Sequence, residues 1–227
     1  MEYSSNKAVR IVAISDTHSM HRALVLPEGD ILIHAGDLTG RGQLEEIEEF
    51  NYWLGMLPFQ YKIIVAGNHD WAFQLTPDIA RRMLTNGIYL QDSGIHLLGL
   101  KFWGSPWQPW FFNWAFNLHR GRPLREKWDL IAPDTDVLIT HGPPQGIGDL
   151  TISGDQAGCE ELLTVVKRIR PTVHVFGHIH EGYGIVKQGA TTFVNASTCT
   201  FSYQPINQPI VLDVYPRDYE LETGFAM

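Results

Sequence analysis

The chain has few cysteines and no long apolar run. Only Cys159 and Cys199 occur among its 227 residues, and two cysteines so far apart suggest reduced thiols in a cytoplasmic protein, with one disulfide as the alternative. No apolar stretch reaches the roughly 18 residues that a membrane-spanning helix needs, so no membrane partner is expected. The apolar stretch Val9–Ile14 is interrupted by Arg10 and lacks a small-residue cleavage site. It is therefore predicted to be a strand and not a signal peptide.

Positive charge is also scarce. Lys and Arg number 17 against 25 Asp and Glu, which gives a net charge of −8, and no run of Lys or Arg occurs. This makes binding to a nucleic-acid backbone unfavourable, so no bulk nucleic acid is expected as a partner. Hydrophobic residues make up 44% and charged residues 19% of the chain, which excludes a disordered protein. No repeat, low-complexity segment or linker divides it, and one domain is predicted over residues 1–227.

Short runs rich in valine and isoleucine alternate with longer amphipathic stretches, a pattern typical of a largely parallel α/β core. The runs predicted as buried strands are Val9–Ile14, Ile31–Ala35, Tyr61–Ala66, Val137–Thr140 and Val173–Phe176. Helices are predicted over Gln43–Met56, over Cys159–Ile169 and from Thr76 to about Thr85.

Later strands are predicted over Leu97–Trp103, Thr191–Asn195 and Ile210–Tyr215. They are not separated by good helices, which indicates a second, mixed sheet packed against the first. The stretch 103–122 holds four of the seven tryptophans and is predicted to be an aromatic-rich loop or cap.

Polar residues follow each of the five buried strands. These residues are Asp16-Thr17-His18, Gly36-Asp37, Gly67-Asn68-His69-Asp70, His141-Gly142 and Gly177-His178-Ile179-His180. Because ligands of open α/β sheets bind at the carboxyl ends of strands, these side chains are expected to meet in one crevice.

Imidazole and carboxylate groups bind divalent transition metals, so this crevice is predicted to hold metal. Seven candidate ligands are too many for one tetrahedral ion and suit two ions that share a bridging carboxylate. The candidates are Asp16, His18, Asp37, Asn68, His141, His178 and His180.

These five motifs, in this order, resemble those of the calcineurin-like metallophosphoesterase superfamily. Further stretches resemble its metallophosphoesterase-domain-containing branch, which is similar to class III cyclic-nucleotide phosphodiesterases. Those stretches are 104–110, 140–144, 178–183 and 195–199, and the whole resemblance runs from about Val9 to Val214. It implies a single metallophosphoesterase domain with a four-layer α-β-β-α sandwich, in which two mixed sheets are flanked by helices.

The resemblance also implies a role for each motif residue. One divalent ion would be held by Asp16, His18 and His180, a second by Asn68, His141 and His178, and Asp37 would bridge them. The ions would be manganese, iron, zinc or a similar metal. His69 would be the catalytic histidine, and Asn68 could donate a hydrogen bond to the phosphate while it holds metal.

The sequence departs from the superfamily at one point. Some of its phosphatases carry Gly-Asp-x-x-Asp-Arg-Gly, and the second Asp orients the catalytic histidine. Here Gly40 stands in its place, so an Asp–His dyad is not predicted, while the following Arg41 is retained and is a candidate phosphate contact.

Four further residues are candidate substrate contacts, namely Trp107, Trp110, His119 and Gly148. The tryptophans could stack on a nucleobase. Alternatively, they could form a packed cap or the interface of a homodimer, where aromatic residues are common.

The predicted function is hydrolysis of small phosphodiesters, of the nucleotide or cyclic-nucleotide kind, by a hydroxide held between two metal ions. A phosphomonoesterase or nucleotidase is the alternative within enzymes, because the ligand set does not separate the two. A weakly active metal- and nucleotide-binding regulator is the alternative outside them. A zinc-stabilised structural domain is disfavoured, since neither cysteine lies in a Cys-x-x-Cys pair.

Overall fold

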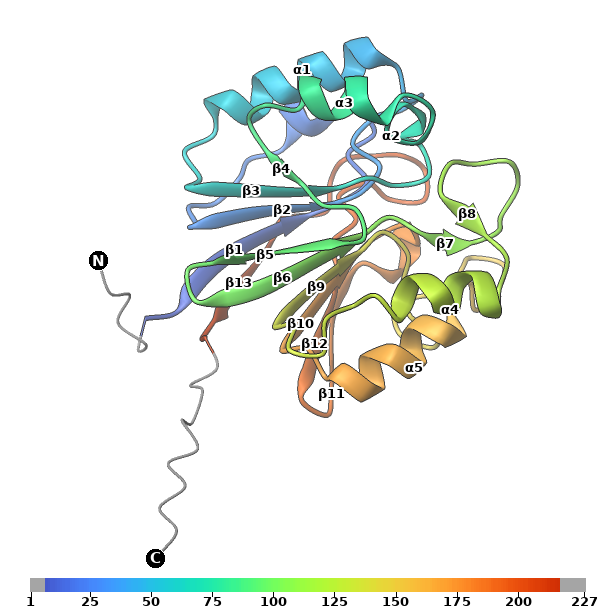
Figure 1. Ribbon diagram of the computed structural model, residues 1–227. Helices are drawn as coiled ribbons and strands as arrows, with labels where there is room; N and C mark the ends of the chain where they lie inside the picture. The colour runs from blue at the N-terminus through green and yellow to red at the C-terminus, as the bar shows by residue number, and fades with distance from the viewer. Residues whose placement is uncertain (1–6, 217–227) are drawn as a thin grey trace, which may run out of the picture.

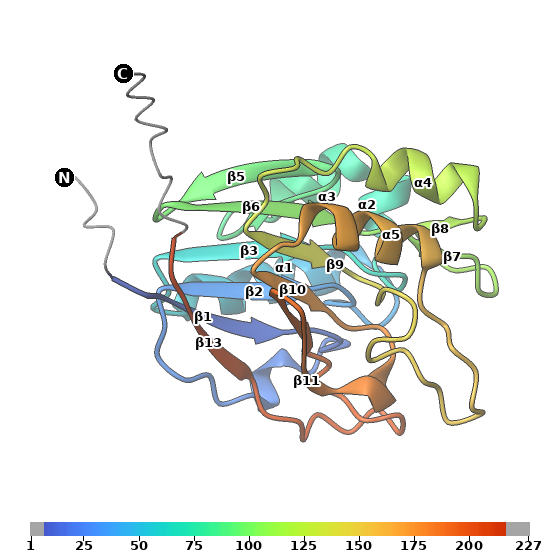
Figure 2. The same cartoon turned by 90° about the horizontal axis from the view of Figure 1, so that it is seen from below.

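Two β-sheets pack face to face in the computed structural model of the chain, which describes residues 7–216 (Figure 1). Helices α1, α2 and α3 cover the outer face of one sheet, and α4 and α5 cover the outer face of the other (Figures 1 and 2). The second sheet predicted from the strand pattern and the four-layer α-β-β-α sandwich implied by the family resemblance are thereby confirmed. The first and last residues of the predicted domain, 1–6 and 217–227, lie outside the described part of the chain.

The first sheet has the strand order β13-β1-β2-β3-β4. Its strands are β1 (Val9–Ile14), β2 (Ile31–Ala35), β3 (Tyr61–Val65), β4 (Ile88–Tyr89) and β13 (Ile210–Val214). All neighbours are parallel except β13, which runs antiparallel to β1 at the edge.

The second sheet has the order β11-β12-β10-β9-β6-β5. Its strands are β5 (Ser93–Leu97), β6 (Leu100–Ser105), β9 (Val137–Thr140), β10 (Val173–Phe176), β11 (Gly184–Gln188) and β12 (Thr191–Asn195). The four central strands are parallel, and β5 and β11 are antiparallel edge strands.

Alternation along each strand builds three separate apolar layers. In β1, Ile11 and Ala13 face the core between the two sheets, whereas Val12 and Ile14 face the helices on the outside. In β9, Val137 and Leu138 divide in the same way between the central core and the layer under α4 and α5. Because successive side chains point to opposite faces, strands that are apolar throughout are buried on both faces.

The helices begin and end where local chemistry favours it. They are α1 (Leu44–Met56), α2 (Trp71–Leu75), α3 (Pro77–Met83), α4 (Arg122–Trp128) and α5 (Glu160–Ile169), with 3-10 turns η1 (His21–Ala23) and η2 (His180–Gly182). A capping box between Gln43 and Glu46 starts α1. No helix among residues 7–216 is long and apolar enough to cross a membrane.

The prediction of one strand over Leu97–Trp103 is wrong. The segment contains the last residue of β5, a two-residue turn and the first four residues of β6. Leu97 pairs with Leu100, and the turn residues Leu98 and Gly99 both have positive φ. Such a two-residue turn favours Asn-Gly or Gly-Gly, so Leu-Gly gives little signal in the sequence. The stretch 103–122 begins inside β6 and contains the short paired strands β7 (Gln108–Pro109) and β8 (Asn117–Leu118).

Two strand histidines lie in the interior, as their sequence context indicates. His34 and His174 are fully buried, and each places Nε2 within 2.9 Å of a threonine Oγ1, of Thr17 and Thr140 respectively. Burial lowers the pKa of both imidazoles from 6.5 to about 3. The folded protein therefore keeps them neutral, whereas the unfolded chain protonates both below about pH 6.5.

We expect the free energy of unfolding to fall as the pH drops from about 6.5 toward 3, because the unfolded state binds protons that the folded state refuses. Each histidine contributes a loss of about 2 kcal/mol between pH 6.5 and 5. Urea unfolding at pH 7 and pH 5 measures this loss, and His174→Gln should reduce the difference. The exposed His96 provides the control His96→Gln. An unchanged pH difference in His174→Gln would rule out the contribution of His174.

Candidate metal centre

The five motif loops meet at one edge of the sandwich, where the carboxyl ends of β1, β2, β3, β9 and β10 lie. Asp16, His18 and Asp37 come from the first sheet, and His141, His178 and His180 come from the second. Ligand atoms of these residues and of His69 fall into three groups, and within each group all atoms lie within 4.8 Å of one another. The group His18, Asp37 and His69 shares a residue with each of the other two. The motif side chains therefore meet at the strand ends, in a crevice between the two sheets.

One group consists of Asp16, His18 and His180. The Nε2 atoms of the two histidines are 3.3 Å apart, and Nε2 of His180 is 3.5 Å from Oδ1 of Asp16. The three residues predicted to hold one ion thus point their donor atoms at one place.

A second group consists of Asp37, His141 and His178. Nε2 of His141 lies 3.5 Å from Oδ2 of Asp37 and 2.8 Å from Oδ1 of Asn68. Oδ2 of Asp37 is also 3.9 Å from Nε2 of His18, a residue of the first group. Asp37 is therefore the carboxylate that lies between the two groups.

Backbone carbonyls fix which ring nitrogen of His141 and of His180 faces the cluster. Nδ1 of His141 donates to the carbonyl of Ala35, and Nδ1 of His180 donates to that of Thr200, each at 3.0 Å. Because Nδ1 carries the hydrogen, the lone pair of the neutral ring lies on Nε2, which faces the cluster. This is the usual outer support of a metal-bound imidazole.

The two carboxylates are also held in place by neighbours. Asp16 accepts hydrogen bonds from the backbone N–H of His178, at 3.0 Å, and from Oγ of Ser197, at 2.6 Å. Oδ1 of Asp37 accepts from the backbone N–H of His69 at 2.7 Å, which leaves Oδ2 toward the histidines. The loop backbones therefore position the carboxylates before any ion binds.

Asp70 joins the loops that follow β2 and β3. Its fully buried carboxylate accepts from the backbone N–H groups of Gly67, Leu38 and Thr39 and from the Thr39 hydroxyl. Burial and the nearby Asp37 raise the pKa of Asp70 to about 6 despite these bonds. The residue is a positioning group, because it ties together the two loops that carry Asp37 and the Gly67-Asn68 turn.

The backbone at the cluster is strained. Four candidate ligands have φ angles in the left-handed region, namely Asp16 at 52°, His18 at 42°, Asp37 at 55° and His178 at 68°. This region is uncommon for residues other than glycine, and such outliers persist where surrounding structure over-determines them. The loops are thus preset to turn each side chain into the crevice, which a strand–loop pattern in the sequence does not reveal.

Gly177, the glycine of the Gly-His-x-His motif, stands where a larger side chain would clash with its neighbours. A Cβ on Gly177 would lie 2.0 Å from Oδ2 of Asp16 and 2.2 Å from Oγ of Ser15. Similarly, a Cβ on Gly67 would lie 2.3 Å from Oδ1 of Asp37. Both glycines let a backbone approach a candidate ligand closely.

Gly177→Ala is expected to displace the Asp16 carboxylate and to weaken metal binding at least about 10-fold, the lower range for loss of a supporting contact. Metal content after dialysis against a fixed free-metal concentration measures this. Gly189→Ala is the control, because Gly189 lies in the turn between β11 and β12, where a Cβ meets open space and an alanine strains only the local backbone, at φ 61°. Equal metal content in both variants would show that Gly177 is not needed for the cluster.

Two carboxylate–imidazole pairs determine which histidines of the cluster have raised pKa values. Burial alone would lower the pKa of His141, but Asp37 raises it to about 9, and Asp16 likewise raises the pKa of His180 to about 9. Burial dominates at the other rings and lowers the pKa of His178 to about 3 and of His18 to about 4. Because a metal-bound imidazole must be neutral, binding of metal ions would release the extra protons of His141 and His180.

The donor set fits divalent metal ions. It combines carboxylate oxygens, an amide oxygen and imidazole nitrogens from buried or nearly buried residues, with their outer atoms already hydrogen-bonded. Imidazole with oxygen ligands suits zinc, iron and manganese rather than a thiolate-bound ion.

His69 lies beside the cluster and is held by several neighbours. Its Nδ1 donates to the carbonyl of Gly40 at 2.9 Å, and its Nε2 is 4.0 Å from Oδ2 of Asp37. The ring packs against Trp114 at 4.2 Å between centroids, with a tilt of 30° between the rings, and edge-on to His18. Gly40 occupies the position where the superfamily motif has the orienting Asp, so a backbone carbonyl takes the place of that carboxylate.

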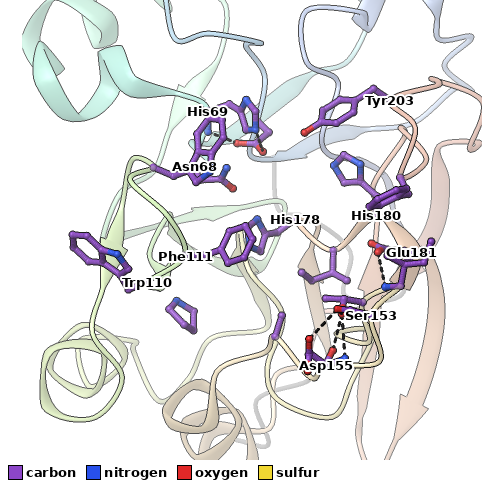
Figure 3. A pocket seen from close by; sticks show the side chains of 18 of the residues that line it. Asn68, His69, Trp110, Phe111, Ser153, Asp155, His178, His180, Glu181 and Tyr203 are labelled. Carbon is purple, nitrogen blue, oxygen red and sulfur yellow. Dashed lines mark hydrogen bonds and ion pairs between the residues drawn. The ribbon is translucent and has the colours of Figure 1, made fainter.

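A cavity of about 530 Å³ opens from the cluster (Figure 3). Asp37, Asn68, His69, His178 and His180 line one part of it. The remaining lining includes Trp110, Phe111, Trp114, Phe201 and Tyr203. Tyr203 packs against His18 and His180 at 4.8 and 5.3 Å between ring centroids. Sequence reasoning missed Phe201 and Tyr203, because their loop carries no motif and only the fold brings it here.

Of the five predicted substrate contacts, one lines the cavity beside the candidate ligands. Trp110 lines the cavity, and its ring stacks on His119, which is not among the lining residues. Gly148 lines a neighbouring cavity. Trp107 is placed elsewhere, since its indole N–H donates to Asp92 at 2.9 Å. Arg41 is exposed and does not line either cavity.

The fold is a four-layer α/β sandwich, and clusters of carboxylate and imidazole groups lie at its strand ends. Both features are those that the resemblance to metallophosphoesterases implies. The chain belongs to the calcineurin-like phosphoesterase family, whose sequence model matches residues 9–182.

Relatives and solved structures agree with this membership. Metallophosphoesterase domain-containing protein 1 of Homo sapiens is 49% identical over 230 residues, covering 90% of this chain and 71% of that protein. A UPF0046 protein of Caenorhabditis elegans is 42% identical, covering 91% of this chain and 60% of that protein. The crystal structure of a Thermus thermophilus protein, TT1561, shares the fold, with a TM-score of 0.59 at 15% identity, covering 91% of this chain and 99% of that one.

Proposed function

We propose that the protein is a metal-dependent phosphoesterase that hydrolyses small phosphodiesters of the nucleotide or cyclic-nucleotide kind. One observation carries the proposal. Two groups of candidate metal ligands lie next to each other with Asp37 between them, and Nε2 of His69, which makes no hydrogen bond to the described residues, lies beside Asp37. Family membership supports the reaction class.

The proposed ligand assignment follows the two groups. Asp16, His18 and His180 would hold one ion, Asn68, His141 and His178 a second, and Asp37 would contact both. Divalent ions bound there supply charge neutralisation for a phosphate and lower the pKa of bound water.

The chain's own groups supply orientation and a proton. The Gly40 carbonyl keeps Nδ1 of His69 protonated, so Nε2 is the atom that exchanges a proton with the cavity. We propose that Nε2 donates this proton to the oxygen of the leaving group. The Asn68 amide oxygen faces His141, which leaves the amide N–H₂ group to donate to a phosphate oxygen.

The two alternatives make different demands on the site. A phosphomonoesterase would use the same ligands, so only relative rates on monoesters and diesters separate it from a diesterase. A regulatory protein with feeble catalysis would be expected to lack part of the machinery. The presence of all seven ligand residues together with His69 favours catalysis.

The test is an activity panel with bound metal quantified on the same samples. Metal-reconstituted protein is given bis(p-nitrophenyl) phosphate, p-nitrophenyl phosphate and 2′,3′- and 3′,5′-cyclic nucleotides. Diester hydrolysis should exceed monoester hydrolysis and should disappear after chelation, while circular dichroism stays unchanged because three apolar layers support the fold. Unfolding on chelation would instead indicate a structural metal, and metal loading without hydrolysis of any ester would contradict the proposal.

A further inference from the structure

The lining of the cavity other than the candidate ligands combines aromatic surface with negative charge. Trp110, Phe111, Phe201 and Tyr203 contribute the aromatic surface, and Asp155 and Glu181 contribute two carboxylates. In Figure 3, Trp110 lies at the left and Phe111 near the centre beside His178, while Tyr203 lies at the upper right, Glu181 at the right and Asp155 at the bottom. The two kinds of surface therefore face the same space.

The aromatic side chains are braced by their neighbours. Trp110 is stacked on His119 with an angle of 10° between the rings, and Phe111 packs edge-on against Phe112. Trp110 and Phe111 are each more than half exposed. Exposed flat rings at the mouth of a cavity favour stacking against a flat, uncharged group.

The two carboxylates are oriented by the loop 150–156. Glu181 accepts from the backbone N–H of Ile152 at 2.8 Å, and Asp155 accepts from Oγ of Ser153 at 2.9 Å. Neither carboxylate pairs with a cationic side chain among residues 7–216. Both carboxylates therefore add negative charge to the lining that no cationic side chain of residues 7–216 offsets.

The cation that lines this part of the cavity is already engaged. Arg120 donates to the carbonyls of Gly158 at 2.7 Å and Ala157 at 3.1 Å, and it forms an ion pair with Glu160. Among the described lining residues, Arg120 is the one lysine or arginine. A second phosphate of a ligand would thus meet two carboxylates and no available positive charge.

We infer that Asp155 and Glu181 are specificity-determining residues, which select phosphoesters with a single phosphate group and a flat, non-anionic ester group. This inference rests on the proposed function for the reaction at the metal end of the cavity. Because both carboxylates are exposed, their repulsion of a second phosphate is screened by salt and weakens as ionic strength rises.

The experiment compares two chromogenic substrates that differ by one remote phosphate. They are thymidine 5′-(p-nitrophenyl phosphate) and the same compound with an added 3′-phosphate. At low ionic strength we expect kcat/KM to favour the first by on the order of tenfold, the effect of two partly screened charges. The ratio should shrink in 0.5 M salt, a concentration about threefold above physiological ionic strength.

The double variant Asp155→Asn/Glu181→Gln removes both charges while each amide oxygen can still accept the loop hydrogen bond. It should bring the ratio close to one at low salt. The control Glu45→Gln/Glu48→Gln makes the same change in net charge on the exposed face of α1, outside the cavity, and should leave the ratio as in the unaltered protein.

A second readout keeps this inference separate from the proposed function. Calorimetric titration of metal-reconstituted protein with thymidine 5′-monophosphate and thymidine 3′,5′-bisphosphate should show the same preference and the same loss of it in the double variant. Equal affinities in the unaltered protein, or a preference that persists in the double variant, would overturn the inference. Binding preference without hydrolysis of either substrate would overturn the proposed function alone.

Discussion

Replacement of Asp37 by asparagine should remove most of the bound metal and lower kcat/KM on a phosphodiester by about 1,000-fold. Oδ2 of Asp37 lies near residues of both candidate groups, at 3.5 Å from His141 and 3.9 Å from His18. A neutral amide cannot balance the charge of two ions, and loss of several kcal/mol of transition-state stabilisation corresponds to this factor. Metal analysis by plasma mass spectrometry and steady-state kinetics on the same preparation measure both effects.

Asparagine is chosen because its amide oxygen can still accept from the backbone N–H of His69, which keeps the loop in place. Asp78→Asn is the control, since Asp78 is exposed in the first turn of α3 and does not line the cavity. An Asp37→Asn protein with its full metal content and full rate would contradict the assignment of Asp37 as the shared ligand.

Replacement of His69 by alanine should lower kcat by about 100- to 10,000-fold, the usual contribution of a positioned acid, and leave metal content intact. Nε2 of His69 lies 4.0 Å from Oδ2 of Asp37 and forms a possible ligand group with His18 and Asp37. The proposed ligand set is complete without His69, so we expect it to act as the acid and not as a ligand. Activity and metal content of His69→Ala are measured together, with the exposed His96→Ala as the control.

Free imidazole sharpens this test, because it can diffuse into the space that His69→Ala leaves beside Trp114 and supply the missing acid. Partial recovery of kcat with added imidazole is expected. Loss of metal in His69→Ala would instead place His69 among the ligands, and an undiminished rate with both metals bound would remove it from the reaction.

The parts of the fold that the sequence predicted are those with a strong local pattern. The strands Val9–Ile14 and Val173–Phe176 have the predicted bounds because valine and isoleucine fill positions that are buried on both faces. The short helix α2 (Trp71–Leu75) and the edge strand β11 were not predicted. Both depend on contacts with the rest of the fold more than on periodicity, and β11 is mostly exposed.

In the candidate site, too, the sequence predicted the residues that carry a local pattern and not the others. The motif residues were found because each follows a buried strand, and the parallel order of those strands brings them together. Tyr203 was missed because no local pattern distinguishes it, and Glu181 was not singled out although it directly follows His180; both line the cavity. The Gly40 carbonyl could not have been predicted as the partner of His69, because a main-chain acceptor has no residue type that marks it in a sequence.

The position of the cluster between the two sheets has a mechanical consequence. Asp16 and His180 lie 164 positions apart, and an ion held by both would tie one sheet to the other across most of the chain. Such a tie restricts the separation of the sheets much as a covalent cross-link would, in a protein whose two cysteines are free. Resistance to proteolysis would then report on the metal supply, because a protein deprived of metal would open between its layers more often than a loaded one.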